Sequence, residues 1–208
     1  MSTTNYQHLT NQLTHALRTG VTVYNFAEST EDKAKAMSNL SNLIDRFGIY
    51  LSTIEGCKSK RVENMGELVG SVVNELQSER VHAIITDVSV KGSAELLKIV
   101  VDELVSNALQ FSTGEVYVSL HKTDRHAVLR VEDFGCGLSD YNLSCIAEPF
   151  SASDNQRSGQ GLGLALTWAI VQEHNGAMTI DNSQKDSGTT VLIMLDLVQD
   201  FDFGAKSI

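Results

Sequence analysis

Two polar residues on one expected helix are the first candidates for chemistry in this sequence. Glu103 and Asn107 stand four residues apart in DELVSNALQF, so on a helix they share one face. A carboxylate can orient or deprotonate a water molecule, and an amide oxygen can be a ligand for Mg²⁺. Taken alone, the pair fits the polar edge of a buried helix better than a site.

A second candidate is VEDFGCGLSD, where Asp133 ends an expected strand and Gly135 and Gly137 follow it. A carboxylate at a strand end can accept a hydrogen bond from an exocyclic amine such as adenine N6. Glycines let a base lie against the backbone. A loop with convenient glycines is the alternative interpretation of this motif.

The third candidate is SGQGLGLALTWAIVQEHNG, in which Gly159, Gly161 and Gly163 directly precede a run of helix formers. A helix N-terminus carries unpaired N–H donors and partial positive charge, so this pattern predicts a phosphate against the helix start. Upstream, EPF ends at Phe150, and the polar SASDNQRS that follows is typical of a closing lid. Arg157 could reach phosphate oxygens from that lid, although a lone charged loop residue is more often merely solvated.

The elements that must position these residues mix helices and strands. The expected helices are residues 64–79, 93–111 and 161–174, and the expected strands are residues 81–87, 115–121, 127–133, 177–182 and 189–197. Because they do not alternate regularly, an α+β sandwich is favoured over a doubly wound sheet.

The N-terminal part, residues 4–55, is expected to be a helical hairpin. Apolar residues in its second helix alternate in steps of three and four, which is the spacing of a coiled-coil seam: Met37, Leu40, Ile44, Phe47, Leu51 and Ile54. Ser29 or Thr30 is expected to cap that helix. Two such helices cannot enclose a core, so we expect dimerisation into a four-helix bundle. Packing of the hairpin against the rest of the chain is the alternative.

Composition limits the partners. The net charge of −10 argues against a general nucleic-acid or anionic-membrane surface, and the sequence has no apolar run long enough to span a bilayer. The three cysteines show no C-x-x-C spacing, and the polar N-terminus does not resemble a signal peptide. A cytoplasmic protein is therefore expected.

Together, E-x-x-x-N, D-x-G-x-G and G-x-G-x-G resemble the N, G1 and G2 boxes of the GHKL ATP-binding superfamily, and Phe150 falls in its F box. QEHNGAMTIDN and SGTTVLIMLDL are similar to the closing strands of its histidine-kinase branch. The resemblance, over roughly residues 61–197, implies a Bergerat-type α/β sandwich that binds ATP and Mg²⁺.

In such a site, the resemblance implies that Asp133 holds adenine and that Asn107 binds the Mg²⁺ that bridges the phosphates. Gly161 and Gly163 would present backbone to the triphosphate. Thr189 would lie near the adenine.

The first expected helix contains LTHALRTGV, which resembles the histidine-kinase H-box. The resemblance implies that His15 accepts the phosphoryl group and that Thr19 is the residue used for dephosphorylating a partner receiver. An ordinary surface histidine is the alternative. Three residues depart from the family pattern: Ala16 replaces an acid, Gly20 a proline and Gln110 a basic residue. These departures bear on autokinase activity more than on nucleotide binding.

The sequence therefore predicts a hairpin domain over 1–57, an ATP-binding domain over 58–198 and a tail over 199–208. The expected function is a cytoplasmic two-component histidine kinase, a homodimer that passes phosphoryl from its histidine to the receiver aspartate of a response regulator. The input is expected to come from a separate sensor or input protein, or the chain is one piece of a larger system. The alternatives are a phosphotransfer or docking module without autokinase activity, and a GHKL ATPase or serine kinase of anti-sigma type, in which Glu103 would supply the base.

Overall fold

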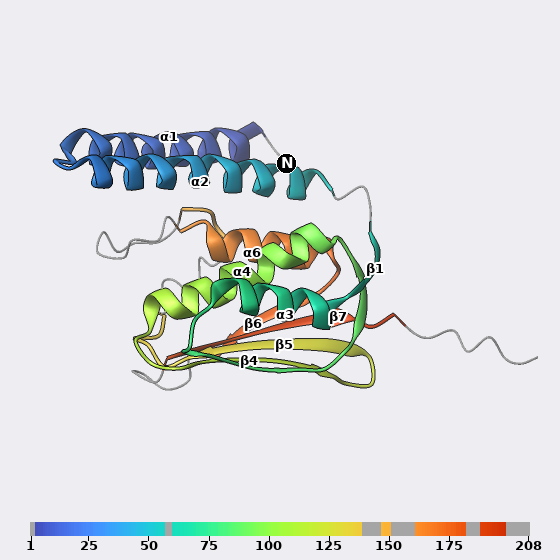
Figure 1. The fold of residues 1–208 in the computed structure, drawn as a ribbon. Coiled ribbons are helices and arrows are strands. Elements are labelled where there is room, and N and C mark those ends of the chain that lie inside the picture. The colour runs from blue at the N-terminus through green and yellow to red at the C-terminus, as the bar shows by residue number, and fades with distance from the viewer. Residues whose placement is uncertain (1–2, 57–59, 139–146, 151–160, 182–187, 199–208) are drawn as a thin grey trace, which may run out of the picture.

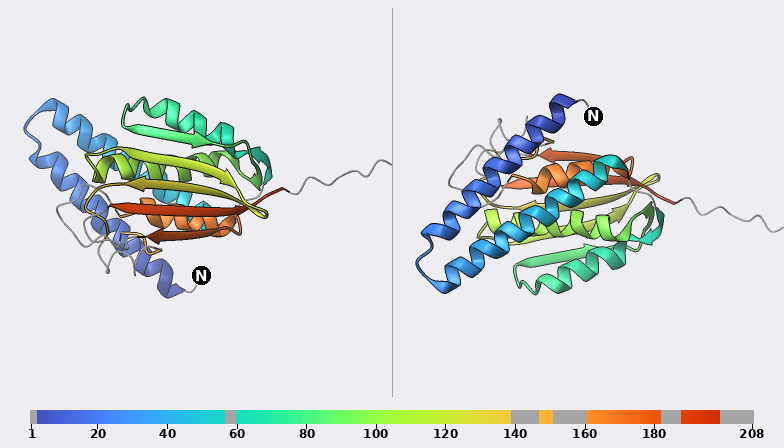
Figure 2. Two further views of the ribbon diagram at one scale, coloured as in Figure 1. Left: turned by 90° about the horizontal axis from the view of Figure 1, so that it is seen from below. Right: turned by 90° about the horizontal axis from the view of Figure 1, so that it is seen from above.

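The computed structural model describes residues 3–56, 60–138, 147–150, 161–181 and 188–198. In these residues three layers are stacked: a β-sheet, three helices on one of its faces, and a helical hairpin above those helices (Figure 1). No described helix covers the other face of the sheet (Figure 2). The α+β architecture predicted from the sequence is confirmed.

The hairpin consists of α1 (Thr3–Phe26) and α2 (Thr30–Glu55). Ser29 has an extended backbone, and its hydroxyl oxygen accepts the N–H of Asp32 at 2.9 Å, which caps the start of α2. The predicted hairpin and one of its two proposed caps are therefore confirmed.

The buried face of α2 differs from the predicted seam. Leu40 and Phe47 are buried as expected, but Met37 and Ile44 are 52% and 56% exposed. The other buried residues of α2 are Ala36, Leu43, Tyr50 and Thr53. These buried residues lie in two helix contacts, because α2 packs against both α1 and α6. The spacing of apolar residues correctly predicted a helix. It could not show which of these residues contact another helix and which face solvent.

The lower part of the molecule is a sandwich of helices on a mixed sheet. Its helices are α3 (Met65–Leu76), α4 (Ala94–Phe111) and α6 (Gly163–Glu173). The sheet has the order β2-β4-β5-β7-β6, and its strands are β2 (Val81–Ile85), β4 (Val116–Lys122), β5 (His126–Asp133), β6 (Ala177–Asp181) and β7 (Thr189–Asp196). Strand β2 is parallel to β4, and the other neighbours are antiparallel.

The sequence analysis missed two short strands. β1 (Arg61–Asn64) and β3 (Ser89–Gly92) pair antiparallel in a small second sheet. Four residues are too few for an alternating pattern to stand out from a loop. Asn64 ends β1 and its side chain accepts the N–H of Glu67 at 3.2 Å, so α3 begins at Met65.

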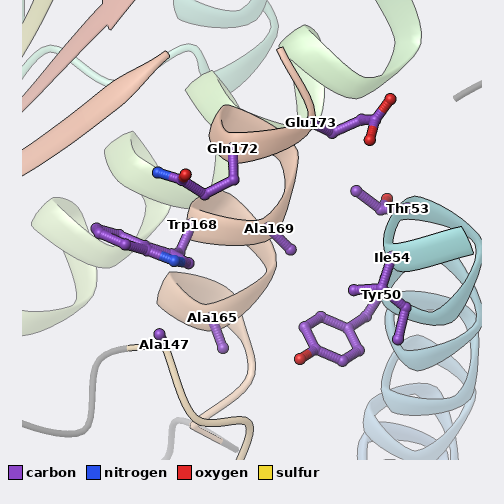
Figure 3. Close-up of a pocket in the computed structure, with 9 residues that line it drawn as sticks. All are labelled: Tyr50, Thr53, Ile54, Ala147, Ala165, Trp168, Ala169, Gln172 and Glu173. Carbon is purple, nitrogen blue, oxygen red and sulfur yellow. The ribbon is translucent and has the colours of Figure 1, made fainter. Parts of the chain in front are cut away.

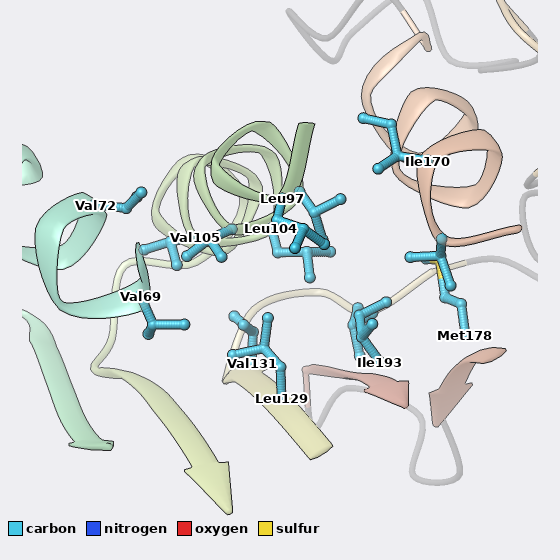
Figure 4. Packing of buried hydrophobic residues seen from close by; sticks show 14 of the residues in the cluster. Val69, Val72, Leu97, Leu104, Val105, Leu129, Val131, Ile170, Met178 and Ile193 are labelled. Carbon is cyan, nitrogen blue, oxygen red and sulfur yellow. The ribbon is translucent and has the colours of Figure 1, made fainter. Parts of the chain in front are cut away.

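The core lies between the helices and the sheet (Figure 4). Leu97 and Leu104 of α4 face Leu129 and Val131 of β5, and all four are buried. The hairpin adds residues to the same cluster: Leu9, Leu43, Phe47 and Tyr50. The alternative in which the hairpin packs on the rest of the chain is thus observed, while the dimer stays a prediction. None of the described helices is long and apolar enough to cross a membrane.

Candidate functional site

Asp133, the last residue of β5, carries a buried carboxyl group that keeps hydrogen-bonding capacity. The residue is 8% exposed, and the N–H of Gly135 donates to its Oδ1 at 2.8 Å. Burial raises the pKa of the Asp133 carboxyl, and the backbone N–H groups of Gly135 and Thr189 oppose that rise. Because a carboxylate can accept about four hydrogen bonds, it can still receive a ligand's amine.

Strand β7 pairs with β5 next to Asp133. Thr189 is the register partner of Asp133, and Gly188 precedes it with a φ of 91°. A Cβ at Gly188 would lie 1.8 Å from the Asp133 carbonyl oxygen, so only glycine fits there. The structure thus brings Asp133, Gly135 and Thr189 together, as the sequence predicted. Gly137 follows two residues after Gly135.

The second part of the site lies where α6 begins against α4. A Cβ at Gly163 would lie 2.5 Å from Oε2 of Glu103 and 3.3 Å from Nδ2 of Asn107. The absence of a side chain at Gly163 therefore lets the first turn of α6 approach both polar residues. Leu162, which precedes α6, makes no side-chain cap hydrogen bond. The first N–H groups of α6 thus retain the capacity to bind a ligand.

Phe150 connects this helix start to the hairpin. Its N–H donates to the carbonyl of Gly161 at 2.9 Å, and its ring lies 5.8 Å from the ring of Phe47 on α2. These two contacts hold Phe150 between the residues that lead into α6 and the hairpin. Arg157 and Gly159, together with the rest of the expected lid, lie outside the described residues.

Arg46 of α2 is a site residue that the sequence analysis missed. Its Nη2 forms an ion pair with Oε2 of Glu103, and the two side chains are 31% and 10% exposed. Burial raises the pKa of the Glu103 carboxyl, and the Arg46 guanidinium opposes that rise. The two residues are 57 positions apart, so no local spacing could have indicated the pair.

His15 lies on the exposed face of α1, as predicted. The hydroxyl of Thr19 donates a hydrogen bond to the backbone carbonyl of His15 at 3.1 Å. The imidazole of His15 takes no part in this bond. Ala16 is partly buried against the core, and α1 continues without a break through Gly20, which packs on Leu40 of α2. Because α1 packs chiefly on α2, the structure does not bring His15 into the cluster around Glu103.

The contact between α2 and α6 is incomplete. Tyr50 and Ile54 of α2 face Ala165 and Ala169 of α6 across a cavity of about 430 Å³, beside Trp168 (Figure 3). The hairpin therefore meets the sandwich through a limited set of side chains. Arg46 and Phe47 are two of them.

The region around α4, β5 and α6 also matches a known family. A sequence profile of histidine kinase-, DNA gyrase B-, and HSP90-like ATPases matches residues 92–199, just over half of the chain. The chain belongs to this ATPase family. The match contains Glu103, Asn107, Asp133, Gly163 and Thr189, whereas Arg46 of the hairpin lies outside it.

Relatives of this ATPase-family chain include sensor proteins. The sensor protein BasS of Salmonella typhimurium is 33% identical over 110 residues, which are 52% of this chain and 31% of that protein. A putative sensor protein of Shewanella frigidimarina is 30% identical over 176 residues, 82% of this chain and 27% of that protein. The chain thus spans less than a third of the length of these relatives.

Solved structures show the same fold. The mycobacterial sensor histidine kinase MprB superposes with a TM-score of 0.60 at 26% identity, covering 67% of this chain and 98% of that one. The Acinetobacter baumannii histidine kinase AdeS has a TM-score of 0.69 at 20% identity and covers 88% of this chain and 98% of that one. The residues that follow the hairpin make up less than 88% of this chain. The likeness in fold to AdeS therefore includes residues of the hairpin.

Proposed function

We propose that this protein is a two-component histidine kinase that binds ATP with Mg²⁺ and phosphorylates His15. The phosphoryl group then passes to an aspartate in the receiver domain of a response regulator. The observation that carries the proposal is the approach of Gly163, at the start of α6, to Glu103 and Asn107. This arrangement supports a phosphate contact, because it brings the start of α6, with its N–H donors, beside the side chain of Asn107.

The described residues fit a nucleotide. The Asp133 carboxylate would accept the exocyclic amine of adenine at a strand end formed with Gly135 and Thr189, and Gly137 would lie against the base. The backbone at Gly161 and Gly163 would contact the triphosphate, and the side-chain oxygen of Asn107 would hold Mg²⁺. When bound, Mg²⁺ neutralises phosphate charge, which lowers the barrier to phosphoryl transfer. From the sequence alone, Arg157 and Gly159 complete the phosphate contacts.

His15 is the acceptor in this proposal. Its imidazole is on the exposed face of α1, and a neutral imidazole is a competent nucleophile near neutral pH. One ring nitrogen attacks the γ-phosphorus as the bond to the bridging oxygen breaks, and ADP leaves. Thr19, one turn further on, is then placed to act when the receiver is dephosphorylated.

A homodimer would supply the missing cover for the hairpin. Val23, Phe26, Met37 and Ile44 are large apolar residues of α1 and α2 that stay exposed in the single chain. Pairing two hairpins into a four-helix bundle buries such positions. A cytoplasmic location completes the proposal. The names of the relatives support it, and they include the histidine protein kinase DivJ of Caulobacter vibrioides, 35% identical over 117 residues.

The test is incubation of the wild type and His15→Ala with γ-³²P-ATP and Mg²⁺, followed by acid and base treatment of the labelled protein. Acid-labile, base-stable label that is lost in His15→Ala is the expected result. His8→Ala removes the other histidine of α1 and is the matched control, expected to keep the label. Label that survives in His15→Ala would contradict the proposed acceptor.

A phosphotransfer or docking module without autokinase activity is the second candidate. Ala16 supports it, because no acid stands next to His15 to help remove the imidazole proton. Absence of label in the wild type, with ATP binding intact in a separate titration, would favour this candidate.

A further inference from the structure

We infer that Arg46 is a positioning residue that keeps Glu103 from activating water while α2 lies against α6. The docked hairpin thereby protects bound ATP from hydrolysis, so that the γ-phosphoryl group remains available to His15. This inference rests on the proposed function, since it concerns the fate of ATP in the same site.

The geometry places Arg46 at the centre of the site although it belongs to the hairpin. Its Nη2 is paired with Oε2 of Glu103 and lies 2.8 Å from the point where a Gly163 Cβ would be. Asn107 approaches that same point to 3.3 Å. The guanidinium thus occupies the junction of α2, α4 and α6, next to the proposed phosphate site.

The hydrogen bonding of Arg46 indicates what holds it there. Its Nε is buried and makes no hydrogen bond among the described residues. Burying an unpaired donor costs free energy, so the Glu103 ion pair must compensate for that cost. The next residue, Phe47, anchors the same turn of α2 through its ring contact with Phe150.

The chemistry at stake is the reaction of ATP with water. A free Glu103 carboxylate would take a proton from a water molecule while the water oxygen attacks the γ-phosphorus. The bond from that phosphorus to the bridging oxygen breaks, and ADP and phosphate leave. The paired guanidinium occupies Oε2 and stabilises the ionised carboxylate, which makes it a weaker base toward water. Departure of α2 from α6 would carry Arg46 away and release Glu103.

The test is phosphate release from ATP by the full chain in four forms: wild type, Arg46→Met, Glu103→Gln and the double variant. Methionine retains an apolar stem of similar length but loses the charge. We expect Arg46→Met to raise phosphate release about tenfold or more, within the range of a general base. The double variant should return to the wild-type rate, and Arg46→Lys, which keeps a cation, should stay near it.

Lys98→Met is the matched control, because Lys98 forms an exposed ion pair with Glu75 at 3.1 Å, away from Gly163. Thermal unfolding without nucleotide checks each variant, and Arg46→Gln replaces Arg46→Met if the latter is unfolded. Titration with a non-hydrolysable ATP analogue separates the two proposals. If no form binds the analogue, the proposed function fails.

Unchanged or slower phosphate release in a folded Arg46→Met that binds the analogue normally would overturn the inference. So would a rise that persists in the double variant, because Glu103 would then not be the base.

Discussion

The hairpin and the sandwich bury their apolar residues to very different extents. In the sandwich, one face of the sheet and the inner faces of α3, α4 and α6 meet, and side chains such as Leu97 and Leu166 are fully buried. In the hairpin, Phe26 stays 81% exposed, and Met37 and Ile44 are also on the surface. The sandwich thus encloses an apolar core, whereas the hairpin leaves several large apolar side chains on its surface.

The two regions nevertheless contact each other at the candidate functional site. Arg46 and Phe47 reach from α2 to Glu103 and Phe150, which belong to the other region. The region with the more exposed apolar residues therefore also supplies the charge beside Glu103. Each of the following experiments separates the two regions, from the largest expected effect to the smallest.

Leu166→Ala tests the completeness of the sandwich. Leu166 of α6 is fully buried, and removal of such a side chain leaves a cavity that lowers the free energy of unfolding by about 3–5 kcal/mol. Ile44→Ala in the hairpin should change it by less than about 0.5 kcal/mol in the monomer. Urea unfolding at low protein concentration measures both changes in the free energy of unfolding. Equal changes in the two variants would contradict the difference in burial between the two regions.

A double substitution of Met37→Glu and Ile44→Glu tests the partner of the hairpin. If these side chains are buried between two copies, their loss should weaken the dimer by about 3 kcal/mol, roughly a hundredfold in Kd. Sedimentation over a range of concentrations measures the change. Nucleotide affinity should be unaffected, and a wild type that is monomeric throughout would remove the basis for the dimer.

Asp133→Asn tests the ligand site of the sandwich. Loss of a charge-assisted hydrogen bond to adenine should weaken nucleotide binding by about 1.5–3 kcal/mol, or roughly ten- to a hundredfold. Glu132→Gln is the matched control, because Glu132 is the neighbouring residue and pairs with Arg130 at 2.7 Å. Calorimetric titration with an ATP analogue is the measurement, and an equal loss in both variants would contradict the assignment.

The pH dependence of Asp133 follows from its burial. Since burial raises the pKa of this carboxyl, nucleotide affinity should begin to fall at a higher pH than an ordinary aspartate would give. The same titration, repeated on the wild type toward acid pH, measures this onset.

The titration of His174 should have a smaller effect, on the stability of the sandwich. This buried residue donates from Nδ1 to the Ile170 carbonyl at 2.7 Å, and its Nε2 accepts the N–H of Ser93 at 3.0 Å. Burial lowers its pKa from 6.5, and the nearby Lys60 acts in the same direction. Glu173 and the hydrogen bond to Ile170 oppose that shift.

The sign of the effect follows from proton uptake. Below pH 6.5 the unfolded chain binds a proton at this histidine before the folded chain does, so stability falls with acidification. The loss is at most about 1.4 kcal/mol per pH unit. His174→Gln should reduce the slope of unfolding free energy between about pH 7 and 5.5, while His15→Gln, which removes an exposed histidine, is the control. An unchanged slope in His174→Gln would contradict the proposed contribution of His174 to the pH dependence of stability.

Much of the fold could be predicted because it depends on local patterns. The hairpin, the long helix α4 and the strands β4, β5, β6 and β7 each carry a periodic apolar pattern that specifies the element and its inner face. Asp133, Asn107 and Gly163 could be selected as candidates because each motif spans only a few residues. The domain boundaries proposed after 57 and 198 stay predictions.

The rest required the tertiary structure. The short strands β1 and β3 pair with each other across a gap in the sequence, and Met37 is exposed although its spacing fits the predicted seam. The ion pair of Arg46 with Glu103 joins residues 57 positions apart. Local spacing determined which elements form and which motifs they carry, because those depend on neighbours along the chain. Only the folded chain decided which charge stands beside Glu103, because that depends on how two separately predictable regions pack.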